Sequence, residues 1–151
     1  MQTFLPYADF ERSAIALDNK RLQKQIVECK QILMTICGSS NGWRNHPAIR
    51  QWIGFDGALA EYAIECCDEH IKRGYRTGLR PWFMDIWQNK PIEYPPWLGY
   101  EPFHSMHRSV LLAKNYDWYW QFGWSEQPAV KNEKGSYPYL WPSKMEIFKN
   151  K

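Results

Sequence analysis

Residues 18–37 read DNKRLQKQIVECKQILMTIC, and their apolar side chains recur at the spacing of an α-helix. One series alternates intervals of four and three residues, which places its members on one side of a helix: Leu22, Ile26, Cys29, Leu33 and Ile36. Asp18 suits the N-cap of such a helix, and Gly38 suits its C-terminal stop. The segment therefore predicts one amphipathic helix that buries a long apolar face.

A single acid, Glu28, lies in the middle of this predicted helix among basic and amide side chains. Arg21, Lys24 and Gln25 lie away from the apolar face, and Arg21 nearly eclipses Glu28 from seven residues away. A carboxylate held among cations on a rigid helix suits a reactive site. Lys24 and Glu28 also form an i,i+4 pair, which on a solvated helix is worth only a few tenths of a kcal/mol. The helix alone leaves both interpretations open.

The composition is that of a globular protein with an unusual supply of aromatic side chains. Of the 151 residues, 44% are hydrophobic, 23% are charged and 17% are aromatic. The aromatic residues exceed what a small core needs, so we expect some of them to line a groove or an interface, where flat rings stack on bases. The net charge is only +3, which allows nucleic-acid binding without indicating it.

Further helices are predicted on both sides of residues 18–37. Residues 9–17 predict a short helix capped by Asp9, and residues 103–115 predict a longer one. A long helix is expected to begin at Pro47 and to end at Gly74, although Gly54 and Gly57 either weaken it or let another segment approach closely. Residues 75–100, rich in proline and aromatic side chains, predict an ordered loop with at most one helical turn.

No run of alternating residues is long enough to predict a strand, so we predict an all-α fold. Residues 1–151 are expected to form a single compact helical domain with aromatic-rich loops, one of which closes on Gly123. Residues 125–151 contain the motif YPYLWP and have no assigned role, and we expect this tail to pack on the domain.

Several classes of site find little support in the sequence. His104 and His107 can share a helix face, but no third metal ligand has an indicated position. The cysteines lack metal-type spacing and are expected to be reduced thiols: Cys29, Cys37, Cys66 and Cys67. There is no glycine-rich phosphate loop, no signal peptide and no apolar run that would span a membrane. We therefore expect a cytoplasmic protein without metal, cofactor or membrane contact.

Three separated segments carry a resemblance to a known family: RLQKQIVE (21–28), His46 with EYAIECCDEHIKRGY (61–75), and HRSVLLAKNYDWYWQFG (107–123). In this order they resemble the pyrimidine-dimer DNA glycosylases, the endonuclease V type that cuts beside ultraviolet photoproducts. The resemblance extends over roughly residues 12–124. It implies a compact helical fold and a glycosylase that also has abasic-site lyase activity.

The resemblance also implies a mechanism. In that family an N-terminal α-amine attacks the sugar C1′, displaces the base and forms a Schiff base. An α-amine has a pKa of about 8, roughly two units below that of lysine, so it is partly unprotonated at neutral pH. By position Glu28 becomes the acid/base group. The family's amine belongs to a Thr exposed by removal of Met, whereas here Gln2 follows Met1, and a large second residue normally protects Met.

These considerations give the predicted site. The expected catalytic residues are Glu28, Met1 or Gln2 as the source of the amine, and Arg21. Lys20 or Lys24 could replace the amine if desolvation lowered its pKa. The residues expected to contact nucleic acid are Lys20, Lys24, Lys30, Arg44, His46, His107 and Arg108.

The predicted substrate is duplex DNA with damaged or modified pyrimidines, bound by a monomer. Val27 and Gln31 stand where the family has arginines that grip phosphate, which leaves the choice of lesion open. Two alternatives remain: a non-catalytic module on the same scaffold that binds nucleic acid or protein, and an enzyme that acts on free nucleosides or nucleotides.

Overall fold

The computed structural model describes residues 1–38 and 44–148, and it confirms the all-α prediction. Within these ranges there is no strand. The helices are α1 (Phe10–Ala16), α2 (Asn19–Ile36), α3 (Pro47–Arg50), α4 (Asp56–Lys72), α5 (Arg80–Asn89), α6 (Glu101–Lys114) and α7 (Tyr116–Tyr119). Short 3₁₀ turns follow at η1 (Trp120–Phe122), η2 (Pro142–Lys144) and η3 (Glu146–Phe148). None of the described helices is both long and apolar enough to cross a membrane.

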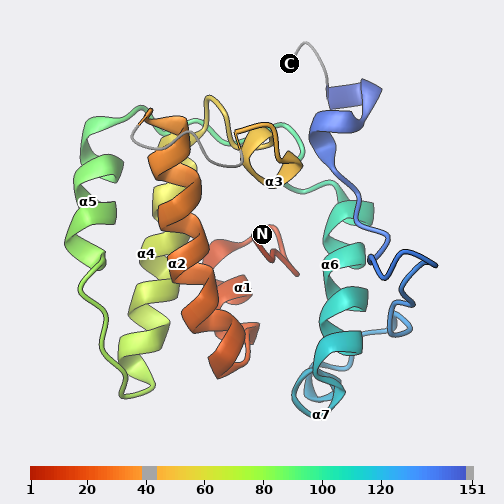
Figure 1. The fold of residues 1–151 in the computed structure, drawn as a ribbon. Helices are drawn as coiled ribbons and strands as arrows, with labels where there is room; N and C mark the ends of the chain where they lie inside the picture. The colour runs from red at the N-terminus through yellow and green to blue at the C-terminus, as the bar shows by residue number, and fades with distance from the viewer. Residues whose placement is uncertain (39–43, 149–151) are drawn as a thin grey trace.

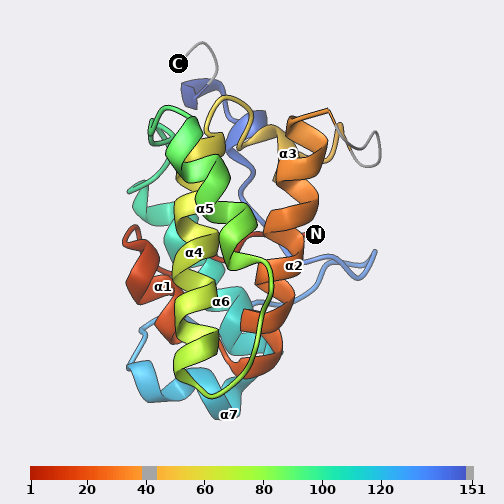
Figure 2. The same cartoon turned by 90° about the vertical axis from the view of Figure 1, so that its left-hand side faces the viewer.

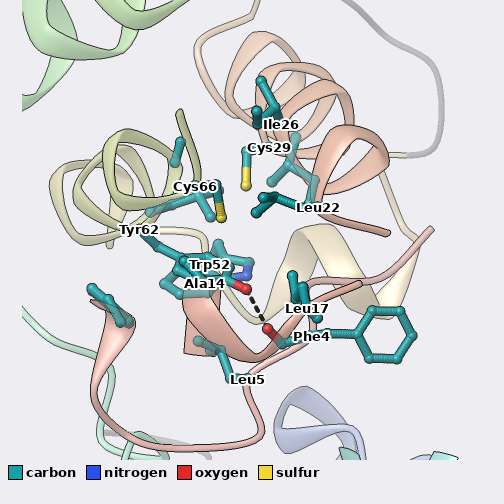
Figure 3. Packing of buried hydrophobic residues seen from close by; sticks show 14 of the residues in the cluster. Phe4, Leu5, Ala14, Leu17, Leu22, Ile26, Cys29, Trp52, Tyr62 and Cys66 are labelled. Carbon is teal, nitrogen blue, oxygen red and sulfur yellow. Dashed lines mark hydrogen bonds between the residues drawn. The ribbon is translucent and has the colours of Figure 1, made fainter. Parts of the chain in front are cut away.

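Helix α4 is the centre of the helical layer, because it packs against α1, α2 and α5. Figure 2 shows α1 and α2 on opposite sides of α4. The core between these helices is apolar, and Figure 3 shows Leu22 and Cys29 of α2 facing Tyr62 and Cys66 of α4. The predicted face of α2 is buried as expected, with only Ile36 partly exposed. All four cysteines are free thiols, and Cys37 is exposed.

The predicted helix boundaries hold where a polar cap or a glycine marks them. Asp9 caps α1 by accepting a hydrogen bond from the backbone N–H of Arg12 at 2.8 Å. Gly38 and Gly74 follow the ends of α2 and α4 with φ values of 83° and 94°, a left-handed conformation that glycine adopts without strain. Asp18 occupies the N-cap position of α2, but its carboxylate makes no capping hydrogen bond.

Two predictions of secondary structure are wrong. The long helix predicted from Pro47 to Gly74 is interrupted between Arg50 and Asp56, where Gly54 has a φ of 89°. Gly57 lets the backbone at Pro91 approach closely, because a Cβ at position 57 would lie 2.6 Å from the Pro91 carbonyl oxygen. Residues 75–100 contain α5 where a loop was expected. A proline stands at the start of this helix, where the backbone N–H has no partner within the helix, so its missing N–H does no harm.

Residues 1–6 form an extended N-terminal arm that runs into the body of the molecule between α2 and α6 (Figure 1). Tyr62 donates its hydroxyl hydrogen to the Phe4 carbonyl, as the dashed line in Figure 3 shows. Gln51 Nε2 and Trp52 Nε1 donate to the Thr3 hydroxyl oxygen at 3.1 and 3.0 Å. These three buried contacts come from residues far along the chain, so the arm is a fixed part of the core.

The tail after α7 returns along α6 toward α3 (Figure 1). The backbone N–H of Ala129 donates to the Ser109 carbonyl of α6 at 3.0 Å, and η2 contacts α3. Tyr139 then packs its ring against Phe4 of the N-terminal arm. This path brings Tyr139 of the tail beside the N-terminal arm.

Candidate active site at the N-terminal arm

A pocket of about 280 Å³ lies between α2, the N-terminal arm, the end of α6 and the tail. Its lining residues are Met1, Gln2, Phe4, Lys20, Arg21, Lys24, Gln25, Glu28, Lys114 and Tyr139. It thus unites all four predicted catalytic residues with two of the predicted DNA contacts, Lys20 and Lys24. Glu28 is the only carboxylate among the lining residues, and it lies beside the start of the chain.

The Glu28 carboxylate is buried and is held by the N-terminal arm. Its Oε2 accepts a hydrogen bond from the backbone N–H of Gln2 at 3.3 Å, and its Oε1 lies 3.9 Å from Lys24 Nζ. Burial raises the pKa of Glu28 above its ordinary value, and the Gln2 hydrogen bond, the terminal ammonium, Lys24 and Lys114 partly offset this rise. A carboxyl group with a raised pKa is suited to both taking up and releasing a proton.

Gln25, one turn before Glu28, fixes the backbone of the N-terminal arm. Its Oε1 accepts from the Phe4 N–H at 2.7 Å, and its Nε2 donates to the Gln2 carbonyl at 3.0 Å. The side-chain amide therefore satisfies two buried backbone groups at once. This side chain was recognised from the sequence only as part of the polar side of the helix.

Helix α6 holds the other side of the N-terminal arm through two histidines. His107 Nδ1 accepts from the Leu5 N–H at 2.8 Å. His104 Nε2 accepts from the Gly99 N–H at 2.9 Å, so its Nδ1 carries the proton and donates to the Leu5 carbonyl at 2.8 Å. Burial lowers the pKa of His107 to about 3, which keeps the ring neutral and able to accept.

Arg21 is held at the pocket by a buried acid. Its Nη1 lies 3.0 Å from Asp18 Oδ2, and Asp18 is 5% exposed. The Tyr119 hydroxyl and the Asn115 amide also donate to this carboxylate, so residues near the end of α6 fix the start of α2. The guanidinium is therefore placed by packing instead of moving freely in solvent.

Three other predicted contacts lie outside the pocket lining. His46 caps α3 by accepting from the Ala48 N–H at 3.0 Å, and burial together with the terminal ammonium lowers the pKa of its ring. Arg44 lines a separate apolar hollow with Ile49 and Ile53. Lys30 lies further along α2. Their contacts with nucleic acid stay predictions.

His107 and Arg108 were expected to contact nucleic acid, but both occupy structural positions. The His107 ring has no exposed area, so phosphate has no access to it. Arg108 pairs with Glu101 and Glu126 and donates to the Pro6 carbonyl at 2.7 Å. Both residues hold the N-terminal arm against α6, and we therefore assign them to positioning and not to DNA contact.

The sequence did not point to Lys114 or Tyr139 as site residues. Lys114 is the last residue of α6, and Tyr139 lies in the tail. Burial raises the pKa of the Tyr139 phenol, and the negative charge of Glu28 raises it further. No local motif marks either residue, because each reaches the pocket only through the tertiary fold. The YPYLWP motif was the one available signal for Tyr139.

Charge is unevenly distributed between the two sides of α4. The groove between α1 and α4 is lined by acids, among them Glu11, Glu65 and Asp68, and burial and these neighbours raise the pKa of Glu65. The pocket on the other side of α2 is lined by four side-chain cations and the single acid Glu28. The net charge of +3 does not reveal this uneven distribution of acidic and basic side chains. The described residues include no group of three or more His, Cys, Asp or Glu side chains arranged to hold a metal ion.

Comparison with known proteins identifies the family of the chain. A family model described as pyrimidine dimer DNA glycosylase matches residues 1–80, just over half of the 151-residue chain. The matched residues include the N-terminal arm, α2 with Glu28, and His46. No curated protein and no solved structure matches the chain. A match over more than half of the chain makes it a member of the pyrimidine dimer DNA glycosylase family.

Proposed function

We propose that this protein is a DNA glycosylase and abasic-site lyase that acts on damaged or modified pyrimidines in duplex DNA. The observation that carries the proposal is the position of the Glu28 carboxylate, 3.3 Å from the backbone nitrogen of Gln2 in a pocket lined by cations. Family membership supports the DNA glycosylase activity in general terms.

The proposed reaction uses two groups of the pocket. The α-amine attacks C1′ of the damaged nucleotide, the bond to the base breaks, and the base leaves with a proton. The C1′–O4′ bond then breaks, the sugar ring opens and O4′ takes a proton from the amine, so that C1′ and the nitrogen form an iminium. The resulting iminium acidifies C2′, Glu28 removes a C2′ proton, and the 3′ phosphate departs in a β-elimination. Hydrolysis of the iminium then releases the amine. In this proposal Arg21, Lys20 and Lys24, which line the pocket, bind the backbone phosphates on either side of the sugar.

Either of two residues can supply the amine. If Met1 is retained, its ammonium lies close enough to Glu28 to lower the pKa of that carboxyl group. If Met1 is removed, the Gln2 nitrogen that lies 3.3 Å from Glu28 Oε2 becomes the α-amine. In both cases the nucleophile lies beside the group that takes the proton, as the mechanism requires.

Borohydride trapping tests the proposal directly. Duplex oligonucleotides with either a thymine photodimer or an abasic site are mixed with the protein and borohydride, and mass spectrometry locates the adduct. We expect a covalent adduct on the first residue of the mature chain, with undamaged duplex as the negative control. An adduct with the abasic site but none with the dimer would contradict photodimer specificity. No adduct from folded protein that still binds DNA would contradict the enzyme and favour the binding module.

The pH dependence of strand cleavage should report the Glu28 carboxyl group. Because the pKa of Glu28 is raised above 4.5, cleavage should increase with pH through a midpoint above that value as Glu28 loses its proton. Lys24→Gln removes a charge that lowers this pKa, so the midpoint should move to higher pH. Lys134→Gln, at an exposed position in the tail, is the matched control and should leave it unchanged. A midpoint that moves to lower pH in Lys24→Gln would contradict the assignment.

A further inference from the structure

Lys114 is a pocket residue to which the reaction above gives no role. It lies in the last turn of α6, across the pocket from Glu28 on α2, and beyond the residues that the family model matches. Lys114 and Glu28 each affect the pKa of the other, so the two charges interact across this space. The pocket therefore brings a second primary amine to the same carboxylate that faces the N-terminal arm.

The surroundings of Lys114 favour its neutral form. Among the described residues no carboxylate forms an ion pair with Lys114; its Nζ lies 5.2 Å from the centroid of the Tyr137 ring. Lys131 Nζ lies at the same distance from that ring. Partial burial, together with Arg21, Lys24 and Lys131, lowers the pKa of Lys114. The charge of Glu28 acts in the opposite direction, but burial and the three cations outweigh it. A lysine with a lowered pKa is more readily deprotonated, and a neutral lysine is a nucleophile.

We propose that Lys114 is a second Schiff-base nucleophile of this pocket, which attacks the C1′ aldehyde of an abasic site from the α6 side. The inference rests on the proposed function. Nζ adds to the aldehyde carbon, the carbonyl oxygen leaves as water, and an iminium forms. Glu28 then removes a C2′ proton and the 3′ phosphate departs, as in the reaction of the α-amine. The substrate class is the ring-opened abasic site, because water is the group displaced from C1′.

This assignment gives Lys114 a different task from the cations on α2. Lys20 and Lys24 lie on the same helix as Glu28, and Lys24 is paired with it. Lys114 approaches from the facing helix, so a sugar that enters the pocket would lie between its Nζ and the Glu28 carboxylate. Tyr137 and Lys131 reach this end of α6 only through the tail, which therefore contributes to the chemistry of Lys114.

Trapping with a blocked terminus tests the inference. The full-length protein is prepared with an acetylated N-terminus, which removes the α-amine, and is trapped with borohydride on a duplex that contains an abasic site. We expect an adduct on the peptide that contains Lys114, formed about 10- to 100-fold more slowly than in the unmodified protein, because lysine ordinarily titrates about two units above an α-amine.

Lys114→Arg in the acetylated protein should abolish this adduct, whereas Lys134→Arg should not. Arginine keeps the positive charge, so DNA binding measured by fluorescence anisotropy should be retained by both variants. If the unmodified protein is trapped and the acetylated protein is not, Lys114 is not a nucleophile and the proposed function stands. An adduct on Lys20 or Lys24 would likewise overturn the inference. No adduct from either protein would overturn the proposed lyase activity and the inference with it.

Discussion

Glu28→Gln is expected to lower the rate of strand cleavage at an abasic site by about 10²- to 10⁴-fold, the usual contribution of a general acid/base group. Glutamine keeps the shape of the side chain and can still accept the hydrogen bond from Gln2, but it cannot take a proton from C2′. The amine is unaffected, so borohydride should still trap the Schiff base. Single-turnover cleavage and trapping, measured side by side, separate the two steps.

The same substitution should not destabilise the fold. Burial raises the pKa of Glu28 in the folded protein, so the ionised carboxylate opposes folding at pH values above its unfolded pKa. Glutamine removes this cost, and the melting temperature at neutral pH should be equal or higher. Glu133→Gln, at an exposed position in the tail, is the control and should leave cleavage unchanged. Full cleavage by Glu28→Gln would contradict the enzyme mechanism and favour a non-catalytic module.

Gln25→Met is expected to affect both stability and catalysis. Methionine has a similar length but cannot bond to the Phe4 N–H or the Gln2 carbonyl, so two buried backbone groups lose their partners. Each unsatisfied group costs about 1–3 kcal/mol, so the free energy of unfolding should fall by roughly 2–6 kcal/mol. The N-terminal arm then no longer holds the amine at Glu28, and cleavage should fall by about 100-fold.

Chemical denaturation and single-turnover cleavage at a temperature where the variant remains folded measure the two effects. Gln23→Met provides the matched control, since Gln23 is an exposed residue of the same helix and should tolerate the change. A variant that loses stability yet cleaves at the normal rate would show that the arm is only structural. The role assigned here to Gln25 would then be wrong.

Helix α2 and the position of Glu28 beside Arg21 and Lys24 could be predicted from the sequence because both depend on local information. The alternating intervals that predicted the buried face hold for Leu22 through Leu33, which pack on α4. The position of Glu28 relative to Arg21 and Lys24 also follows from helix geometry alone. The family resemblance then selected between a solvated ion pair and a site, and the pocket brings these residues together.

The parts that could not be predicted depend on distant segments. The predicted helix is interrupted where Gly54 adopts a left-handed backbone conformation. The apolar spacing of residues 47–74 does not reveal this interruption. Helix α5 was missed because its prolines and aromatic residues were attributed to a loop. Lys114 and Tyr139 join the pocket only after α6 and the tail fold against the N-terminal arm. His107 was expected to contact nucleic acid, but it is buried against Leu5, which lies 102 residues earlier in the chain.

The separation of charge across α4 has a consequence for how DNA is encountered. Four side-chain cations surround the single acid of the pocket, whereas mostly acids line the groove between α1 and α4, so the local field is more positive on the pocket face. A polyanion that comes near therefore exerts a torque that turns this face toward it before contact. A small net charge limits indiscriminate attraction to undamaged DNA, while the orienting field remains. Under the proposed function, this field would turn the pocket toward duplex DNA before contact.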